Sequence, residues 1–211
     1  IQHNVDVCVV GGGMSGLCAA VAAARNGASV VLMQDRPVLG GNGSSEVRVG
    51  LLGAYGHWNF SRRETGVVEE VDLESLYLNP GRNWEVWAAV LHGFVKSQPG
   101  LELLLNCSCL DGEMSDGHLH SIRGWELTSY TWHEVSAKQF IDCSGDSILG
   151  EIAGAEMRSG REATADAAEA LSRLCSPGRG RPAVAGSRSK CSMAKAAASG
   201  RLSGTGRRAS E

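Results

Sequence analysis

The chain has 211 residues, of which 43% are hydrophobic and 20% charged, enough for one sizeable globular domain or one domain with part of a second. No apolar run is long enough to cross a bilayer, and the first residues lack the charged-then-apolar pattern of a secretory signal. These features argue against a membrane protein, and we expect a cytoplasmic protein.

The formal net charge of −3 hides a difference between two parts of the chain. Residues 1–163 hold 11 Lys and Arg against 20 Asp and Glu, whereas residues 164–211 hold 9 against 3, so the balances are −9 and +6. All five Trp, three Tyr and three Phe precede residue 164. We therefore expect a folded domain at 1–163, too acidic to favour nucleic-acid binding, and a low-complexity, disordered tail at 164–211.

A strand, a glycine-rich turn, a helix and a second strand follow one another in the first 33 residues. Residues 5–10 (VDVCVV) form a β-branched run that ends in three glycines. The Ala-rich residues 14–26 have high helical propensity, and Gly27 ends the helix. Residues 28–33 (ASVVLM) form the next strand. Because a helix connects the two strands, they must be parallel.

The turn GGGMSG at residues 11–16 matches the GxGxxG pattern, and its glycines have separate physical roles. Gly11 allows a tight turn, Gly13 lets a pyrophosphate approach the backbone, and Gly16 lets the helix pack closely on the strand. The free N–H groups and positive end of the helix would then face the phosphates. Its place between a strand and a helix favours a dinucleotide site over an ordinary turn.

The second strand of such a site ends in an acid that accepts hydrogen bonds from the ribose hydroxyls. This chain has Gln34 there and Asp35 one residue later. An amide can bond two hydroxyls but does not repel a 2′-phosphate by charge. Gln34 followed by Asp35 therefore does not show whether the site prefers NAD or NADP. The absence of an acid at position 34 matters less for FAD, which has no 2′-phosphate.

A long loop, a helix and a third strand are expected next. Residues 35–66 are rich in Gly, Ser, Asn and Arg, which is typical of a loop at a ligand site. Residues 83–97 have apolar side chains at helical spacing with Asn83 in the N-cap position, and residues 101–105 predict a buried strand.

The following segment changes to the pattern of antiparallel strands. Residues 107–139 alternate polar and apolar side chains with a turn at Asp116 and Gly117, which predicts a three-stranded meander. An apolar strand at 140–142 and a helix at 148–155 complete the expected domain.

The cysteines and histidines show no spacing typical of a metal site. There is no CxxC pair, and Cys107 and Cys109 point to one face of a strand, where they cannot easily form a disulfide. We expect a reducing compartment. Five scattered histidines are expected to be surface or hydrogen-bonded core residues: His57, His92, His118, His120 and His133.

Four segments resemble the family of FAD-dependent oxidoreductases that share the glutathione-reductase-like flavin-binding fold. They are residues 5–50, ETGVVEE at 64–70, LYLNPGRNWEVW ending at Trp87, and FIDCSGDSILGEIAGAEMRSGREA at 140–163. The resemblance spans residues 5–163 in the expected order. It implies an α/β fold, a Rossmann-like parallel sheet that binds FAD or NAD(P), with helices on one side and the antiparallel meander on the other.

The resemblance also implies roles for individual residues. The first glycine turn, with Met14 and Ser15, would face the pyrophosphate, and Gln34 and Asp35 the adenosine ribose. Cys109 would contact adenine through its backbone. A glycine doublet with its loop toward the isoalloxazine, and a second glycine turn, supply the remaining positions: Gly40, Gly41, Asn42, Ser44 and Ser45, then Ser144, Gly145 and Asp146.

The implied function is that of an FAD-dependent oxidoreductase, in which the cofactor supplies the electron chemistry and the protein orients it. The substrate, the electron acceptor and the catalytic residues stay unassigned. Family members continue into a substrate-covering domain and a last flavin-contacting strand and helix, whereas residues 164–211 have the composition of an out-of-frame reading of GC-rich DNA. We therefore expect a truncated chain. The alternatives are a tRNA-modifying flavoprotein, an adenine-dinucleotide-binding module without catalysis, and a non-functional truncated product.

Overall fold

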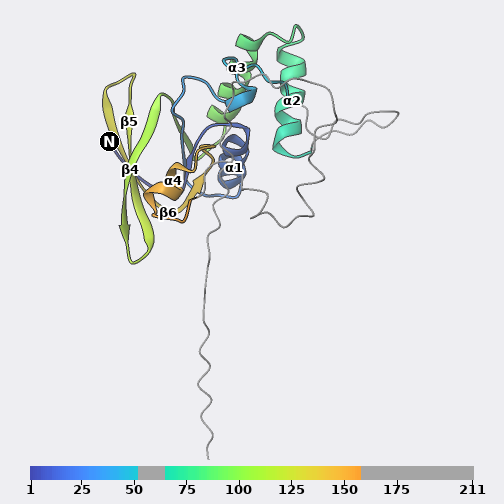
Figure 1. Ribbon diagram of the computed structural model, residues 1–211. Helices are drawn as coiled ribbons and strands as arrows, with labels where there is room; N and C mark the ends of the chain where they lie inside the picture. Colours follow the sequence, from blue (N-terminus) through green and yellow to red (C-terminus); the bar gives the residue numbers. More distant parts are fainter. Residues whose placement is uncertain (52–64, 158–211) are drawn as a thin grey trace, which may run out of the picture.

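The computed structural model describes residues 1–51 and 65–157, which form one six-stranded sheet in the order β3-β2-β1-β6-β5-β4 (Figure 1). The strands are β1 (Gln2–Val10), β2 (Val30–Met33), β3 (Leu101–Leu104), β4 (Cys107–Ser115), β5 (His118–Glu126) and β6 (Thr131–Asp142). The helices are α1 (Met14–Arg25), the 3-10 helix η1 (Gly41–Gly43), α2 (Val67–Leu78), α3 (Trp84–Lys96) and α4 (Ile148–Ile152).

The first strand, helix and second strand form the expected βαβ unit. β1 runs parallel to β2 on one side and to β6 on the other, and β3 continues the sheet parallel to β2. Val10, at the end of β1, is level with Met33 of β2 and with Asp142 of β6. The carboxyl ends of these three strands therefore meet at one edge of the sheet.

The meander is part of the same sheet, which corrects the expectation of a separate strand at 140–142. β6 is one strand of 12 residues. It pairs antiparallel with β5 between Thr131 and Ser136, and parallel with β1 between Glu134 and Asp142. The change from alternating to apolar side chains suggested two strands. It instead marks the point where the pairing of β6 with β5 ends and only the pairing with β1 continues.

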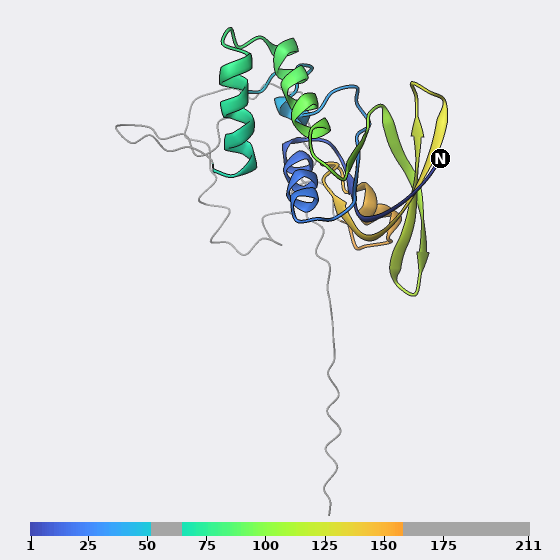
Figure 2. The same cartoon turned by 180° about the vertical axis from the view of Figure 1, so that it is seen from behind.

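Helices cover one face of the parallel strands, and the meander with α4 lies on the other (Figures 1 and 2). Alternate residues of β1 show the two layers: Val9 packs with α1 and α3, and Cys8 packs with β4, β5 and β6. Both side chains are fully buried. The predicted α/β fold and its two faces are confirmed.

The helix α2 is the element that the sequence pattern did not reveal. It begins after Gly66, which has a φ of 69° and provides no side-chain cap. Large apolar side chains are exposed along it, including those of Leu73, Leu76, Tyr77 and Leu78. An apolar stripe is therefore hard to read from its sequence. Residues 52–64 of the expected long loop and the expected tail at 164–211 lie outside the described residues. No described helix is long and apolar enough to cross a membrane.

A buried chain of hydrogen bonds joins the meander to the parallel strands. His3 Nδ1 lies 3.0 Å from a Glu102 oxygen, His3 Nε2 lies 2.9 Å from His133 Nδ1, and His133 Nε2 lies 3.0 Å from a Glu126 oxygen. His3 and His133 are 8% and 3% exposed. Together the three contacts form a continuous chain that runs from Glu102 through both imidazole rings to Glu126.

These contacts bear out the expectation for His133 as a hydrogen-bonded core residue. His92, His118 and His120 are exposed, as expected, and His57 lies outside the described residues. The hydroxyl of Ser129 and the ring of His133 hold the pKa of Glu126 below its ordinary value. The sequence reading overlooked His3, because its partner His133 is 130 residues away.

Replacing His133 with Phe is expected to lower the free energy of unfolding by about 1–3 kcal/mol, because it leaves the buried Nε2 of His3 without its partner and removes one of the hydrogen bonds to the Glu126 carboxylate. Urea unfolding measures the change, with exposed His118→Phe as the control. The His3→Phe/His133→Phe double variant should lose less than the two single losses added together. Strict additivity would contradict a shared network.

Stability should also fall in acid because of Asp6. The Lys138 ammonium and the backbone and hydroxyl of Ser29 donate to its carboxylate, which holds its pKa below the ordinary value. A carboxyl group with a lowered pKa in the folded state stabilises the fold above its unfolded pKa, and the contribution is lost as the pH falls through the folded pKa. Asp6→Asn should flatten the decline in unfolding free energy below pH 4. The matched Asp116→Asn variant should keep the wild-type slope, and identical slopes for both variants would count against this role.

Candidate functional site

A cleft of about 620 Å³ opens at the edge where β1, β2 and β6 end. Its walls come from the residues that directly follow these strands, at 11, 13–15, 34–36 and 143–145, and from the loop that begins at residue 38. The chain passes from β1 through α1 to β2 on one side of β1, whereas its neighbour on the other side, β6, is reached through the meander, so the strand order reverses at β1. In open α/β sheets, such a reversal at the carboxyl ends of the strands is where ligands bind.

The first glycine turn joins the three strand ends. Gly11 has a φ of 102°, and its N–H donates to the carbonyl of Met33 at 2.8 Å. A Cβ at Gly11 would overlap the carbonyl of Cys143, and a Cβ at Gly16 would overlap the carbonyl oxygen of Gly11. These two glycines therefore serve the close packing of helix and strands, as expected for the first and third positions of the motif.

Gly13 differs from its two neighbours in the motif because space surrounds it. It is the N-cap of α1 with an ordinary φ of −63°, and the nearest atom to a Cβ built on it is the Cα of Gly41 at 3.9 Å. The cap makes no side-chain hydrogen bond, and the first turn of α1 contains no acidic residue. The N–H groups at the start of α1 therefore open onto the cleft beside a position without a side chain.

A second glycine turn forms the opposite wall of the cleft. The N–H of Gly40 donates to the carbonyl of Gly12 at 2.8 Å, and Gly40 forms a β-bridge with Gly13. Gly40 and Gly41 have φ values of 108° and 57°. A Cβ at Gly41 would lie 3.1 Å from the Cα of Gly13. The positive φ values and this close approach therefore favour glycine at Gly40 and Gly41, whereas a Cβ at Gly13 would fit.

Gln34 makes hydrogen bonds within the protein that the sequence did not reveal. Its side chain is 4% exposed, its Oε1 accepts from the N–H of Gly12 at 2.6 Å, and its Nε2 donates to the carbonyl of Val38 at 3.2 Å. The amide therefore holds the glycine turn and the following loop together. Asp35 is exposed and also lines the cleft, and its carboxylate, which has no hydrogen-bond partner among the described residues, is an acceptor at the end of β2.

Side chains in the loop after Gly41 stabilise its backbone. The buried hydroxyl of Ser44 accepts from the N–H groups of Glu46 and Val47. Arg36 pairs with Glu46 at 2.8 Å, and both residues line the cleft. The indole N–H of Trp87 in α3 donates to the carbonyl of Gly43 at 2.7 Å.

The turn after β6 is organised by two polar side chains. The hydroxyl of Ser144 donates to the carboxylate of Asp142 at 2.6 Å and accepts from the N–H of Ile148. The other oxygen of Asp142 accepts from the N–H of Leu149 at 2.8 Å. The hydroxyl that the sequence singled out at Ser144 therefore shapes the turn and the start of α4.

Most of the predicted binding residues line this cleft, and four do not. Those that line it are Gly11, Gly13, Met14, Ser15, Gln34, Asp35, Gly40, Gly41, Asn42, Ser44, Ser144 and Gly145. Gly16, Ser45, Cys109 and Asp146 are not among the lining residues. The sequence reading missed six further lining residues: Arg36, Val38, Glu46, Val47, Leu51 and Cys143. Their positions inside the expected loop and next to Ser144 were the available signal.

Cys109 lies in β4, with its side chain in the core between the meander and the parallel strands. It pairs with Gly124 in the β4–β5 ladder, and its side chain packs with Cys107 and Met33. Burial, with the nearby charges of Asp111 and Asp142, raises the pKa of Cys109 to about 12. The thiol therefore stays protonated at neutral pH, and a backbone contact of Cys109 with adenine stays a prediction.

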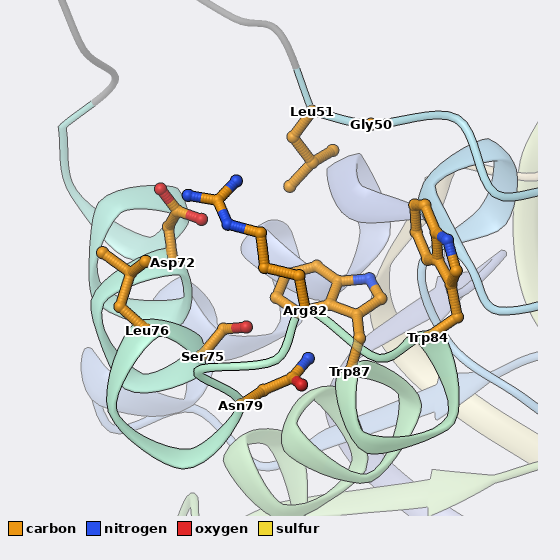
Figure 3. Close-up of a pocket in the computed structure, with 9 residues that line it drawn as sticks. All are labelled: Gly50, Leu51, Asp72, Ser75, Leu76, Asn79, Arg82, Trp84 and Trp87. Atoms are coloured by element: carbon orange, nitrogen blue, oxygen red, sulfur yellow. The ribbon is translucent and has the colours of Figure 1, made fainter.

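A second cavity, of about 290 Å³, lies beside the cleft between α2, α3 and the loop at residues 50 and 51 (Figure 3). Leu51 lines both hollows. Trp84, Trp87 and Leu76 form apolar walls, and Asp72 and Arg82 bring one charge of each sign to the same cavity.

The sequence matches the model of a protein family described as FAD dependent oxidoreductase over residues 6–201. The match extends past residue 163, where the sequence reading placed the end of the family resemblance. No curated protein matches the chain significantly.

Among solved structures similar to this chain, one described as a variant of FAD-dependent halogenases shares the fold at low sequence identity. The myxobacterial chondrochloren halogenase CndH is 15% identical with a TM-score of 0.54, and the match covers 75% of this chain and 41% of that one. The glycerol-3-phosphate dehydrogenase from Bacillus halodurans complexed with FAD is 15% identical with a TM-score of 0.49, covering 72% and 37%. The p-nitrophenol 4-monooxygenase from Pseudomonas putida is 13% identical with a TM-score of 0.49, covering 75% and 46%. This chain thus spans less than half the length of these structures.

Gly16→Ala is expected to destabilise the protein by about 1–3 kcal/mol or more, because the added methyl group overlaps backbone that cannot move freely. Chemical denaturation measures the loss. Gly93→Ala in α3 is the matched control, since nothing lies within 4 Å of a Cβ there. Equal stability of Gly16→Ala and wild type would show that α1 does not pack on the turn as described.

Proposed function

The chain belongs to the family of FAD dependent oxidoreductases, and on this premise we propose that the cleft at the start of α1 binds the ADP portion of FAD. The observation that carries the proposal is the uncapped first turn of α1, which faces a second glycine turn with no side chain between them. Backbone N–H groups and the positive end of a helix favour a diphosphate in this position. The size of the cleft also lies in the range of cofactor pockets.

Each wall of the cleft suits a different part of that ligand. The turn at Gly13 and the start of α1 would hold the phosphates, and the Asp35 carboxylate would accept from the ribose hydroxyls. The loop at Asn42 would lie along the part of FAD that connects the phosphates to the flavin ring. Gln34 supports the site indirectly. Its side chain accepts from the N–H of Gly12 and so fixes the glycine turn in the conformation that leaves the N–H groups at the start of α1 free to bind phosphate.

Bound FAD would supply the electron chemistry, so the task of the protein is to bind, orient and shield it. We propose that the whole protein is an oxidoreductase whose substrate and electron acceptor are unassigned. No catalytic acid or base is assigned among residues 1–51 and 65–157. The competing proposal is a module that holds an adenine dinucleotide without catalysis.

Gly13→Ala tests the ligand site without disturbing the fold. The backbone at Gly13 accepts a methyl group, which would project toward the phosphates, so we expect FAD affinity to fall at least about tenfold with little change in stability. Titration of the apoprotein with FAD, followed by flavin fluorescence, measures the affinity. Gly93→Ala should bind FAD as the wild type does.

Two results would count against FAD as the ligand. Equal affinity of Gly13→Ala and wild type would place the dinucleotide elsewhere. A wild-type protein that binds NAD but not FAD, and is purified colourless, would favour the module without flavin chemistry.

A further inference from the structure

The cavity beside the cleft has the composition of a small-molecule site (Figure 3). It lies between α2, the turn at Arg82 and the first turns of α3, outside the glycine turns that form the dinucleotide cleft. Because Leu51 lines both hollows, a ligand in the cavity would lie next to the cleft. Its volume of about 290 Å³ suits a small organic molecule.

Aromatic and aliphatic side chains make the walls that an apolar ligand body needs. Trp87 is buried, and its indole N–H is already committed to the carbonyl of Gly43 at 2.7 Å, so its ring is held in place. Trp84 is half-buried at the first position of α3. Leu51 and Leu76 complete the apolar surface. Aromatic rings held in this way favour flat or bulky apolar groups.

The polar groups in the cavity divide into committed and uncommitted ones. Asn79 is committed, because its amide exchanges hydrogen bonds of 2.8 Å with the backbone N–H and carbonyl of Asn83. The side chains of Asp72 and Arg82 make no ion pair or hydrogen bond with any residue that the structure describes. Figure 3 shows the Arg82 guanidinium extending across the cavity on the side of the Asp72 carboxylate.

Arg82 is presented to the cavity by a constrained turn. Its φ is 48°, in the left-handed region that a residue other than glycine seldom adopts. The N–H of Arg82 donates to the carbonyl of Asn79 at 2.9 Å, and Asn79 also fixes the following N-cap, Asn83. Hydrogen bonds of Asn79 therefore fix the backbone on either side of Arg82, and this backbone places the Arg82 side chain at the cavity.

We propose that this cavity binds a small amphoteric molecule, such as an amino acid with an apolar side chain. A ligand carboxylate would accept from the Arg82 guanidinium, which suits that planar group. An anion alone would face the Asp72 carboxylate, so a neighbouring ammonium on the ligand is needed to satisfy both charges. The apolar part would lie against Trp84 and Trp87. Binding of this molecule needs no flavin and is independent of the proposed function. Only the further step, that the bound molecule is the substrate, rests on the proposed function.

Three probes separate the charges of the ligand. The full chain, without added flavin, is titrated with L-phenylalanine, with 3-phenylpropanoate and with phenethylamine. Indole N–H signals in ¹⁵N–¹H spectra report binding, and Trp84→Phe identifies the signal of Trp84. We expect phenylalanine to shift this signal, and each singly charged analogue to bind about tenfold or more weakly.

Substitutions on the two charged walls assign the contacts. Arg82→Gln should weaken the binding of phenylalanine about tenfold and leave the binding of phenethylamine unchanged. Asp72→Asn should weaken the binding of phenylalanine and leave the binding of 3-phenylpropanoate unchanged. Glu74→Gln on α2 and Lys96→Gln at the end of α3 change the same charges outside the cavity and should bind as the wild type does.

A phenylalanine affinity that both Arg82→Gln and Asp72→Asn leave unchanged would overturn the proposal. So would the absence of any shift of the Trp84 indole signal when phenylalanine is present in excess over the protein. Equal binding of phenylalanine and 3-phenylpropanoate would overturn the two-charge recognition. FAD titration of the same samples keeps the two claims apart: FAD binding without amino-acid binding rejects this inference alone.

Discussion

The first turn of α1 imposes the constraint on which the rest of the site depends. Backbone N–H groups at a helix start must find a partner, and no described side chain supplies one here. Their exposure is maintained by neighbours that lack side chains: Gly13 at the cap and Gly41 across the cleft. The fold therefore keeps a set of donors open at the point where three parallel strands end.

Much of this could be predicted because it depends on neighbours in the sequence. The glycine turn, the helix capped by Asn83 and the turn at Asp116 each carry a local signal that the structure confirms. Gln34 lies at the end of β2 as expected, and its contact with the ribose stays a prediction, but its hydrogen bond to the glycine turn was not foreseen. Whether its amide faces outward or back toward Gly12 depends on the space behind the turn, which no sequence pattern specifies.

The features that escaped prediction depend on distant contacts. β6 is one strand because β1 and β5 lie on either side of it, and its change of pattern marks different partners along its length. The histidine chain joins His3 to His133 across the sheet. The cavity with Asp72 and Arg82 needs α2, whose exposed leucines conceal its helical pattern, and α3 to lie side by side. The proposed dinucleotide cleft and the cavity beside it share Leu51 in their walls.

The most direct test of the central claim is the response of the backbone amides to ADP. Titration of the ¹⁵N-labelled full chain should give its largest amide shifts at Met14 and Ser15, with smaller shifts at Gly40 and Gly41 across the cleft. Inorganic sulfate at the same concentration should produce weaker changes at the same amides. If Met14 and Ser15 stay unchanged at saturating ADP, the open start of α1 does not bind a diphosphate and the account fails.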